Sequence, residues 1–280
     1  MSQKVWFITG TSKGFGRVWA EAALARGDQV AATARNIDSL ASLTQRYGKQ
    51  VAALKLDVTN KSEVQAAIAE AHQRFGRLDV VINNAGYGLF GTIEEVSEQE
   101  ARAQIETNLF GALWVTQAAL PIMRAQGSGH IIQVSSIGGV NAFPTIGLYH
   151  ASKWALEGFS QALAAEVAPF NIKVTIVEPG GYATDWGGSS AIRATAIGAY
   201  DPARERIAAF RKNSAPGDPD ATGPAILKVV DAQDPPLRIF FGSGGLPMTR
   251  AEYGRRIETW EKWNALSIEA QGNLAAKPKS

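Results

Sequence analysis

The 280-residue sequence predicts a single α/β domain, built on a doubly wound parallel sheet of about seven strands with helices on both faces. Two observations lead to this prediction. Short apolar runs alternate with longer segments of helical periodicity, as in strand–helix–strand units. Glycine-rich or polar turns follow the runs, at the edge where an open α/β sheet binds its ligand. We expect residues 185–219 to form a lid over that edge and residues 274–280 a frayed tail.

The first predicted strand, Lys4 to Thr9, ends in a turn with the spacing G-x-x-x-G-x-G, and a helical pattern follows. Gly10 permits a tight turn, Gly14 lets the backbone approach a pyrophosphate, and Gly16 allows close packing of helix on strand. The start of the helix would offer free N–H groups and a positive dipole end to the phosphates. This turn, in its strand–helix setting, predicts dinucleotide binding.

The second predicted strand, Gln29 to Ala34, ends without the carboxylate that would hold the ribose hydroxyls of NAD. Arg35 stands there instead and can pair with a 2′-phosphate. Lys13, in the glycine-rich turn, can add to the same positive pocket. Solvated surface cations are the alternative interpretation of both residues. In this setting we predict that NADP(H) is preferred over NAD(H).

The remaining elements keep the same alternation. Further strands are predicted at Val51–Leu56, Leu78–Ile82, His130–Ser135, Ile172–Val177 and Leu237–Phe241. Helices are predicted at Ile37–Tyr47, Lys61–Phe75, Ser97–Ala125, from Tyr149 to about Ala168, and at Pro202–Lys212, Ala221–Ala232 and Thr249–Ser267.

Two of the predicted helices contain residues that are unusual for a solvent-exposed helix. Asn108, inside the long fourth helix, indicates either a satisfied interior polar residue or a kink. Tyr253, Trp260 and Trp263, on the last helix, are predicted to lie in the core or at a subunit interface rather than against a ligand.

Composition argues against several classes of function. The formal charge of +2 is too small to indicate a nucleic-acid partner. Three histidines and no cysteine argue against a metal site, and the lack of cysteine fits a reducing cytosol. No signal peptide and no long apolar run is visible. We therefore expect a cytoplasmic protein with no membrane partner and no metal.

The candidate catalytic residues are a tyrosine, a lysine and a serine. Tyr149 lies four residues before Lys153, so the two share one face of a helix, and Ser136 lies thirteen residues upstream of the tyrosine. An ammonium group near a phenol lowers its pKa and makes it a usable general acid/base. A solvated Tyr–Lys pair is the alternative. His150 points away from its neighbour and is interpreted as structural, and no histidine has an evident nucleophile partner, which argues against a hydrolase.

With these residues in place, the chain resembles the short-chain dehydrogenase/reductase family over residues 4–184. The turn TGTSKGFG is similar to the family's cofactor loop. Asp57 matches its adenine-contacting acid, and NNAG at 83–86 matches its sheet-stabilising motif. The family spacing to the tyrosine favours Ser136 over the adjacent Ser135. The family's catalytic tetrad then falls on Asn108, Ser136, Tyr149 and Lys153.

The resemblance implies a Rossmann-type fold and the reversible, NADP(H)-dependent reduction of a ketone or aldehyde to an alcohol. Tyr149 would be the general acid/base, and Ser136 would stabilise charge on the carbonyl oxygen. Lys153 would lower the Tyr149 pKa and bind the nicotinamide ribose, while Asn108 would hold a water leading to solvent. The implied cofactor contacts are Gly10, Ser12, Lys13, Gly14, Phe15, Gly16, Arg35, Asp57, Val58, Asn84, Ala85, Gly86, Tyr149, Lys153, Pro179, Gly180 and Thr184.

The segment VEPGGYATDW, 177–186, is similar to family members resembling 17β-hydroxysteroid and retinol dehydrogenases and bacterial carbonyl reductases. Those proteins act on apolar carbonyl compounds and alcohols, so an apolar small-molecule substrate is expected. The predicted pocket residues are Phe143, Leu148, Tyr182 and Trp186, with packing inside the lid as the alternative for each. The resemblance also implies a homodimer or homotetramer. An NAD(H)-linked alcohol or hydroxysteroid dehydrogenase and a non-catalytic NADP(H)-binding redox sensor are the alternatives.

Overall fold

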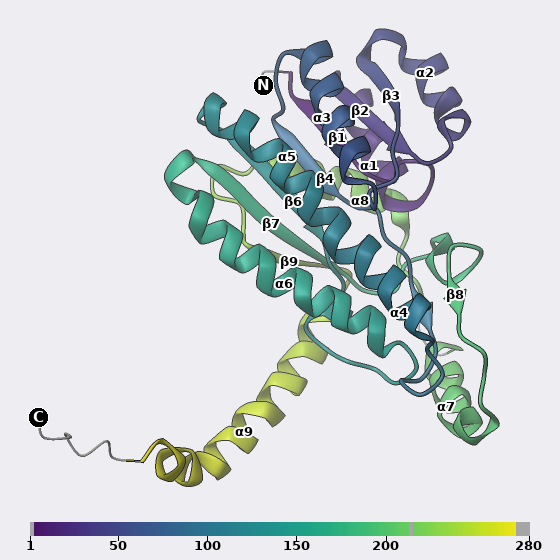
Figure 1. Cartoon of the computed structure of the whole chain (residues 1–280), viewed down its shortest axis with the longest axis vertical. Helices are drawn as coiled ribbons and strands as arrows, with labels where there is room; N and C mark the ends of the chain where they lie inside the picture. The colour runs from purple at the N-terminus through teal and green to yellow at the C-terminus, as the bar shows by residue number, and fades with distance from the viewer. Residues whose placement is uncertain (1–2, 213–214, 273–280) are drawn as a thin grey trace, which may run out of the picture.

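The computed structural model describes residues 3–212 and 215–272, which contain a seven-stranded parallel sheet with helices on both faces (Figure 1). The strand order is β3-β2-β1-β4-β6-β7-β9. The order reverses between β1 and β4, which is the point where a doubly wound sheet binds its ligand. The predicted Rossmann-type fold is confirmed. The strands of this sheet are β1 Val5–Ile8, β2 Gln29–Ala34, β3 Val51–Lys55, β4 Val80–Asn83, β6 Gly129–Val134, β7 Ile172–Pro179 and β9 Arg238–Phe241.

Two apolar cores, one on each face of the sheet, hold the helices in place. The first lies under α3, α5 and α6, and the second lies under α1, α2 and α8. Both faces of the sheet are thus buried, which explains why its strands are apolar throughout. The helices are α1 Gly14–Ala25, α2 Ala41–Tyr47, α3 Lys61–Phe75, α4 Glu98–Ile105, α5 Gly111–Gln126, α6 Gly147–Val167, α7 Asp201–Lys212, α8 Thr222–Asp231 and α9 Gly245–Gln271.

The long helix expected from Ser97 is interrupted. A π-helical turn, Glu106–Phe110, separates α4 from α5 and contains Asn108, whose side chain is buried. A π turn widens the helix by one residue and often marks a functional position. Of the two interpretations of Asn108, the structure supports both, since the residue is a satisfied interior polar group and also stands at a break in regular helix.

The segment 185–219 crosses the carboxyl edge of the sheet, and residues 213 and 214 within it lie outside the described part. Its β8, Ile192–Arg193, pairs in parallel with β5, Leu89–Phe90. Glu95 fastens it further, because its carboxylate accepts the Ile197 N–H and pairs with Arg204 on α7. The segment therefore sits beside the β4–α4 connection, while the expected tail 274–280 lies outside the described residues.

The last helix departs from expectation. α9 leaves the body of the molecule and runs outward (Figure 1), and every residue described from 257 onward is exposed. Trp260 and Trp263 are 64% and 57% exposed, so the core alternative of the prediction is wrong, and the subunit interface stays a prediction. No helix in the described ranges has the length and apolar character that crossing a bilayer requires.

Candidate active site

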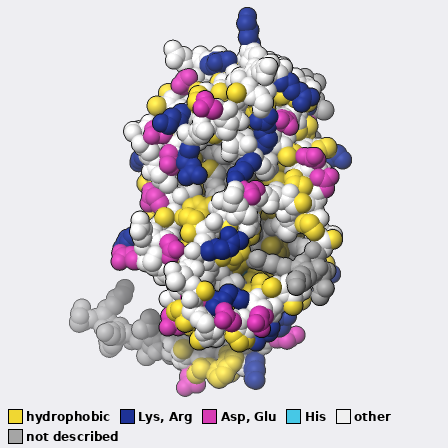
Figure 2. All heavy atoms as spheres, turned by 90° about the vertical axis from the view of Figure 1, so that its right-hand side faces the viewer, with side chains coloured by type: hydrophobic (Ala, Val, Ile, Leu, Met, Phe, Trp, Pro, Cys, Tyr) yellow, Lys and Arg dark blue, Asp and Glu magenta, His cyan; other side chains and the backbone are white. Residues whose placement is uncertain are grey.

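The sequence motifs converge on the carboxyl edge of the sheet. The glycine-rich turn follows β1, the NNAG motif ends β4, Ser136 follows β6, and Pro179 ends β7. The face of the molecule beside β8 and α7 is hollowed, with hydrophobic side chains inside the hollow and Lys and Arg side chains around it (Figure 2). A site at this edge draws its residues from segments far apart in the chain.

The glycine-rich turn has the geometry that the sequence predicts. Gly10 and Gly14 have φ of +70° and +61°, a region that favours glycine. A Cβ on Gly16 would lie 2.4 Å from the Gly10 carbonyl oxygen, so only glycine fits there. A Cβ on Gly14 would meet nothing within 4 Å, and the first turn of α1 carries no acidic residue and no side-chain cap. The free N–H groups at this helix start fit a pyrophosphate.

The NNAG motif holds the turn in place. The Asn84 amide donates to the carbonyl oxygens of Thr9 and Gly10 at 2.9 and 3.0 Å. The Thr9 hydroxyl oxygen accepts the N–H groups of Asn84 and Ala85, both at 2.9 Å. These four bonds join the end of β4 to the end of β1 across the point where strand order reverses.

The residues expected around the adenosine end of a cofactor lie at this edge as well. Arg35 is exposed at the end of β2. Asp57 closes a tight turn by accepting the N–H and hydroxyl of Thr59, and Val58 packs where a Cβ on Gly111 would stand. Lys13, however, forms an ion pair with Asp185 of the segment that follows β7. The lysine therefore links the glycine-rich turn to that segment, a contact the sequence did not predict.

Ser136, Tyr149 and Lys153 meet as predicted. The hydroxyls of Ser136 and Tyr149 share a hydrogen bond, and the Lys153 Nζ lies 5.8 Å from the centre of the tyrosine ring. The ammonium donates to the Val134 carbonyl oxygen at 2.7 Å, so β6 orients the lysine. Tyr149 and Lys153 are 6% and 5% exposed. Tyr149 and Lys153 are buried near the start of α6, and the half-buried Ser136 joins them from the end of β6.

The direction of the Tyr149 pKa differs from the expectation. Burial raises the Tyr149 pKa to about 12, against a smaller lowering effect of the Ser136 hydrogen bond. Burial also lowers the Lys153 pKa to about 8, although the Glu157 carboxylate opposes this. The prediction considered only the attraction between the ammonium and the phenolate, whereas here both groups are taken out of water, which disfavours the charged form of each.

Asn108 reaches the same cluster from the π turn. Its amide donates to the Tyr87 carbonyl oxygen and to the Ser152 hydroxyl, both at 3.1 Å, and its oxygen accepts the Tyr87 N–H. A Cβ on Gly86 would lie 3.0 Å from the Asn108 oxygen and 3.7 Å from the Lys153 Nζ. The absence of a side chain at Gly86 thus lets Asn108 and Lys153 approach the same point.

The loop before Tyr149 is held by two features, only one of them predicted. His150 is structural, as expected, because its ring bonds the Gly138 carbonyl and accepts the Phe143 N–H, both at 2.9 Å. Thr145 has a φ of +68°, which is rare for a β-branched residue. Its carbonyl oxygen accepts the Gly91 N–H. No sequence signal marks this strained position.

The four predicted pocket residues separate into two groups. Trp186 packs edge-on against Tyr149 with ring centres 4.9 Å apart. Its other neighbour is Phe90, at 5.2 Å, which sequence reasoning missed because β5 is only two residues long. Tyr182 instead packs against Phe15 at the start of α1, away from Tyr149. Phe143 lies against His150, and Leu148 is half-buried on α6.

A pair of carboxyl groups lies behind the lysine, and sequence reasoning did not single it out. Glu157 is one turn from Lys153 on α6, and its side chain and that of Glu178 on β7 are 6% and 1% exposed. Arg238 pairs with both, at 2.9 and 3.7 Å. Ser135 faces this pair rather than Tyr149, since a Cβ on Gly139 would touch both Ser135 and Glu157. The choice of Ser136 as the candidate serine is consistent with this placement.

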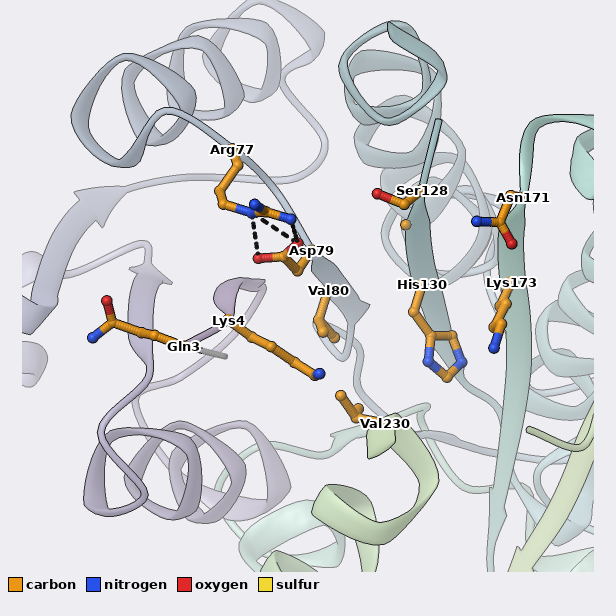
Figure 3. Close-up of a pocket in the computed structure, with 11 residues that line it drawn as sticks. Gln3, Lys4, Arg77, Asp79, Val80, Ser128, His130, Asn171, Lys173 and Val230 are labelled. Carbon is orange, nitrogen blue, oxygen red and sulfur yellow. Dashed lines mark hydrogen bonds and ion pairs between the residues drawn. The ribbon is translucent and has the colours of Figure 1, made fainter. Parts of the chain in front are cut away.

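Two cavities are present elsewhere. One of about 310 Å³ lies at the amino edge of the sheet, where Lys4, His130 and Lys173 line it together with the paired Arg77 and Asp79 (Figure 3). Another, of about 270 Å³, lies between α8 and β9. Neither includes the tetrad. Within the described ranges, no group of three or more His, Cys, Asp or Glu side chains is arranged to hold a metal ion.

Comparison with known proteins identifies the family. The family model described as short chain dehydrogenase matches residues 4–193. The chain is 42% identical to oxidoreductase BOA17 of Botryotinia fuckeliana over 95% of its length and 98% of that protein. It is 39% identical to the 3-ketodihydrosphingosine reductase of Bacteroides thetaiotaomicron, over 86% of its length and 89% of that protein.

Solved structures agree with this assignment. A short-chain dehydrogenase from Streptomyces avermitilis has 38% identity and a TM-score of 0.90, covering 96% of this chain and 98% of its own. A Burkholderia cenocepacia short-chain dehydrogenase in complex with NADP has 25% identity and a TM-score of 0.75, covering 93% and 97%. The glycine-rich turn, the cluster around Tyr149 and these matches lead to one conclusion: the chain belongs to the short-chain dehydrogenase/reductase family of oxidoreductases.

Proposed function

We propose that this protein reduces an apolar ketone or aldehyde to an alcohol with NADPH, and catalyses the reverse oxidation. The observation that carries the proposal is the hydrogen bond between the half-buried Ser136 and the buried Tyr149, with the Lys153 ammonium beside it. Two neighbouring hydroxyls can together hold a carbonyl oxygen and supply its proton. NADPH, when bound, supplies the hydride.

Each residue of the cluster has a physical task. A protonated Tyr149, favoured by a pKa of about 12, donates its proton to the developing alkoxide. Ser136 donates a hydrogen bond to the same oxygen and stabilises its charge. Lys153 holds positive charge beside the phenolate that remains, and Asn108 fixes the surrounding backbone through Tyr87. The water expected at Asn108 remains part of this proposal.

The cofactor preference is proposed from the positive charges near the glycine-rich turn. Arg35 takes the place of a ribose-binding carboxylate and is free to approach a 2′-phosphate. Lys13 lies in the turn itself, although Asp185 pairs with it here. The relative solved with NADP gives independent support for this class of cofactor.

An apolar substrate is proposed from the walls around Tyr149. Trp186 and Phe90 present aromatic rings next to the phenol. Among the relatives, the one from Bacteroides thetaiotaomicron is named for a ketone reductase, and its name includes a dihydrosphingosine. Ketones with a long apolar chain are therefore the first substrates to test.

The decisive experiment is Tyr149→Phe, which removes one hydroxyl and keeps the ring. We expect turnover of a ketone panel with NADPH to fall by about 10²–10⁴-fold, while NADPH binding measured by fluorescence is unchanged. Tyr47→Phe, on α2, is the matched control and should keep full activity. Near wild-type turnover in Tyr149→Phe would refute the mechanism.

The same panel separates the alternatives. Higher catalytic efficiency with NADH than with NADPH would replace the cofactor assignment by an NAD(H)-linked dehydrogenase. Tight NADPH binding without turnover of any carbonyl or alcohol would favour a non-catalytic redox sensor.

A further inference from the structure

We propose that α9 is the interface of a homodimer, in which the α9 helices of two copies of this chain pair in antiparallel orientation. The proposal starts from the way α9 leaves the body. Thr249 bonds to Asn141, and the Arg256 guanidinium lies 4.8 Å from the centre of the Trp154 ring. Beyond Arg256 every described residue is exposed. About four turns of helix, some 20 Å long, therefore extend from the body without intramolecular packing.

An apolar stripe runs along α9, both beside the body and beyond it. The stripe consists of Leu246, Tyr253, Ile257, Trp260 and Ile268, spaced by seven, four, three and eight residues. At 3.6 residues per turn these positions fall within about 80° of one face. Their exposed fractions run from 36% for Tyr253 to 64% for Trp260 and Ile268. Arg250 and Asn264 lie on the same face and interrupt the stripe. Exposed apolar side chains in this number along one face still mark a docking surface rather than a solvated face.

The charges on α9 identify the occupant. The half nearest the body, up to Ile257, carries three arginines and one glutamate, a net charge of +2. The outer half, from Glu258, carries three glutamates and one lysine, a net charge of −2. Antiparallel pairing sets each half against the opposite half of the other copy, whereas parallel pairing opposes like charges. The helix is thus complementary to itself about a two-fold axis, as an isologous interface requires.

The same charges disfavour another occupant. A helix that lies on an anionic membrane carries an excess of Lys and Arg beside its apolar face. The outer half of α9 has the opposite sign, and its carboxylates would be repelled by acidic headgroups. A second copy of this chain satisfies both the stripe and the charges.

Two substitutions with the same charge change test the stripe. Trp260→Glu changes a residue on the stripe. Leu266→Glu changes a residue on the opposite face of the same helix, where the native leucine is 52% exposed. In sedimentation velocity over a range of protein concentrations, we expect wild type and Leu266→Glu to dimerise. For Trp260→Glu, the dimer dissociation constant should rise by about 30-fold or more, because the variant loses a central aromatic anchor of the interface. Circular dichroism will show that both variants are folded.

The relative orientation of the two α9 helices is tested by cysteine cross-linking. The native chain has no cysteine, so each introduced cysteine can link only to the same residue of a second copy. Ile257→Cys lies near the expected two-fold axis and should form a disulfide-linked dimer under mild oxidation. Ile268→Cys should not link to itself in an antiparallel pair but would do so in a parallel one. Efficient linking through Ile268→Cys overturns the antiparallel arrangement.

Three results would overturn the interface itself. One is a wild-type protein that stays monomeric at every concentration, and another is a dimer that Trp260→Glu leaves intact. The third is a monomer that floats with phosphatidylglycerol vesicles through α9, because that would make the membrane surface the occupant. Reversing the charge with Glu261→Lys should weaken the dimer as well, and more so at low salt.

Discussion

The buried carboxyl pair, Glu157 and Glu178, should make the protein less stable as pH rises. Arg238 is the cation that pairs with both carboxyls, and it cannot balance two negative charges. Burial raises the Glu178 pKa to about 8, and repulsion from Glu157 adds to the rise. A protonated Glu178 can donate a hydrogen bond to Glu157, so one proton is shared between them. Replacing Glu178 by Gln keeps the shape and removes the ionisation.

The sign and size follow from proton linkage. An unfolded glutamate ionises near pH 4.5, whereas folded Glu178 keeps its proton to about pH 8. Between these values the folded state binds more protons, so the free energy of unfolding falls as pH rises and levels off above about 8. The full shift would correspond to roughly 5 kcal/mol at 1.36 kcal/mol per pKa unit. Because the Arg238 side chain is 35% exposed, solvent screens these charges and reduces the contribution to stability. We therefore expect a change of about 2 kcal/mol in the free energy of unfolding.

Urea unfolding at pH 5 and at pH 8.5 measures the effect. Glu178→Gln should match wild type within about 0.5 kcal/mol at pH 5 and exceed it by about 2 kcal/mol at pH 8.5. Glu166→Gln, at an exposed position on the same α6, is the control and should show no pH-dependent difference. A Glu178→Gln variant that is less stable than wild type at pH 8.5 would show that the ionised pair stabilises the fold, and would refute the reasoning.

Four further predictions concern the site. Gly16→Ala places a Cβ 2.4 Å from a carbonyl oxygen, and should lower stability by about 1–3 kcal/mol and weaken NADPH binding in calorimetry, while Gly158→Ala, which meets nothing, should be neutral or stabilising. Arg35→Asp should reverse the ratio of kcat/KM for NADPH and NADH; an unchanged ratio would exclude Arg35 as the 2′-phosphate contact. Trp186→Ala should raise KM for long-chain ketones more than for acetone-sized ones, and equal effects would remove it from the pocket. The value of kcat/KM for reduction should fall above about pH 8 as Lys153 loses its charge, and a profile flat to pH 10 would contradict that role.

The parts of this molecule that sequence predicted are those set by local pattern. Strand–helix alternation locates the seven strands, because each buried parallel strand is apolar on both faces. The glycine positions at Gly10 and Gly16 follow from backbone geometry that few other residues can adopt. Ser136, Tyr149 and Lys153 were found by spacing along one helix and one strand end, and the structure brings them together.

The parts that sequence did not predict depend on neighbours far along the chain. Whether the Tyr149 pKa rises or falls depends on how much water its surroundings exclude, and no spacing encodes that. Tyr182 and Trp186 are four residues apart in one irregular segment, yet they face different clusters. A tryptophan such as Trp260 is expected to be covered, but the outer part of α9 extends from the molecule and leaves this side chain 64% exposed.

The bonds between Asn84 and the Thr9 segment have a consequence for the life of the protein in the cell. They join residues 75 positions apart, so the nucleotide-binding turn takes its shape only after the centre of the sheet has closed. A nucleotide therefore selects chains that have finished folding, and at a hundredfold excess over its dissociation constant it adds about 2.7 kcal/mol to their stability. When the nucleotide is scarce, more chains should open and reach proteases, so the abundance of this protein would follow the supply of its own cofactor.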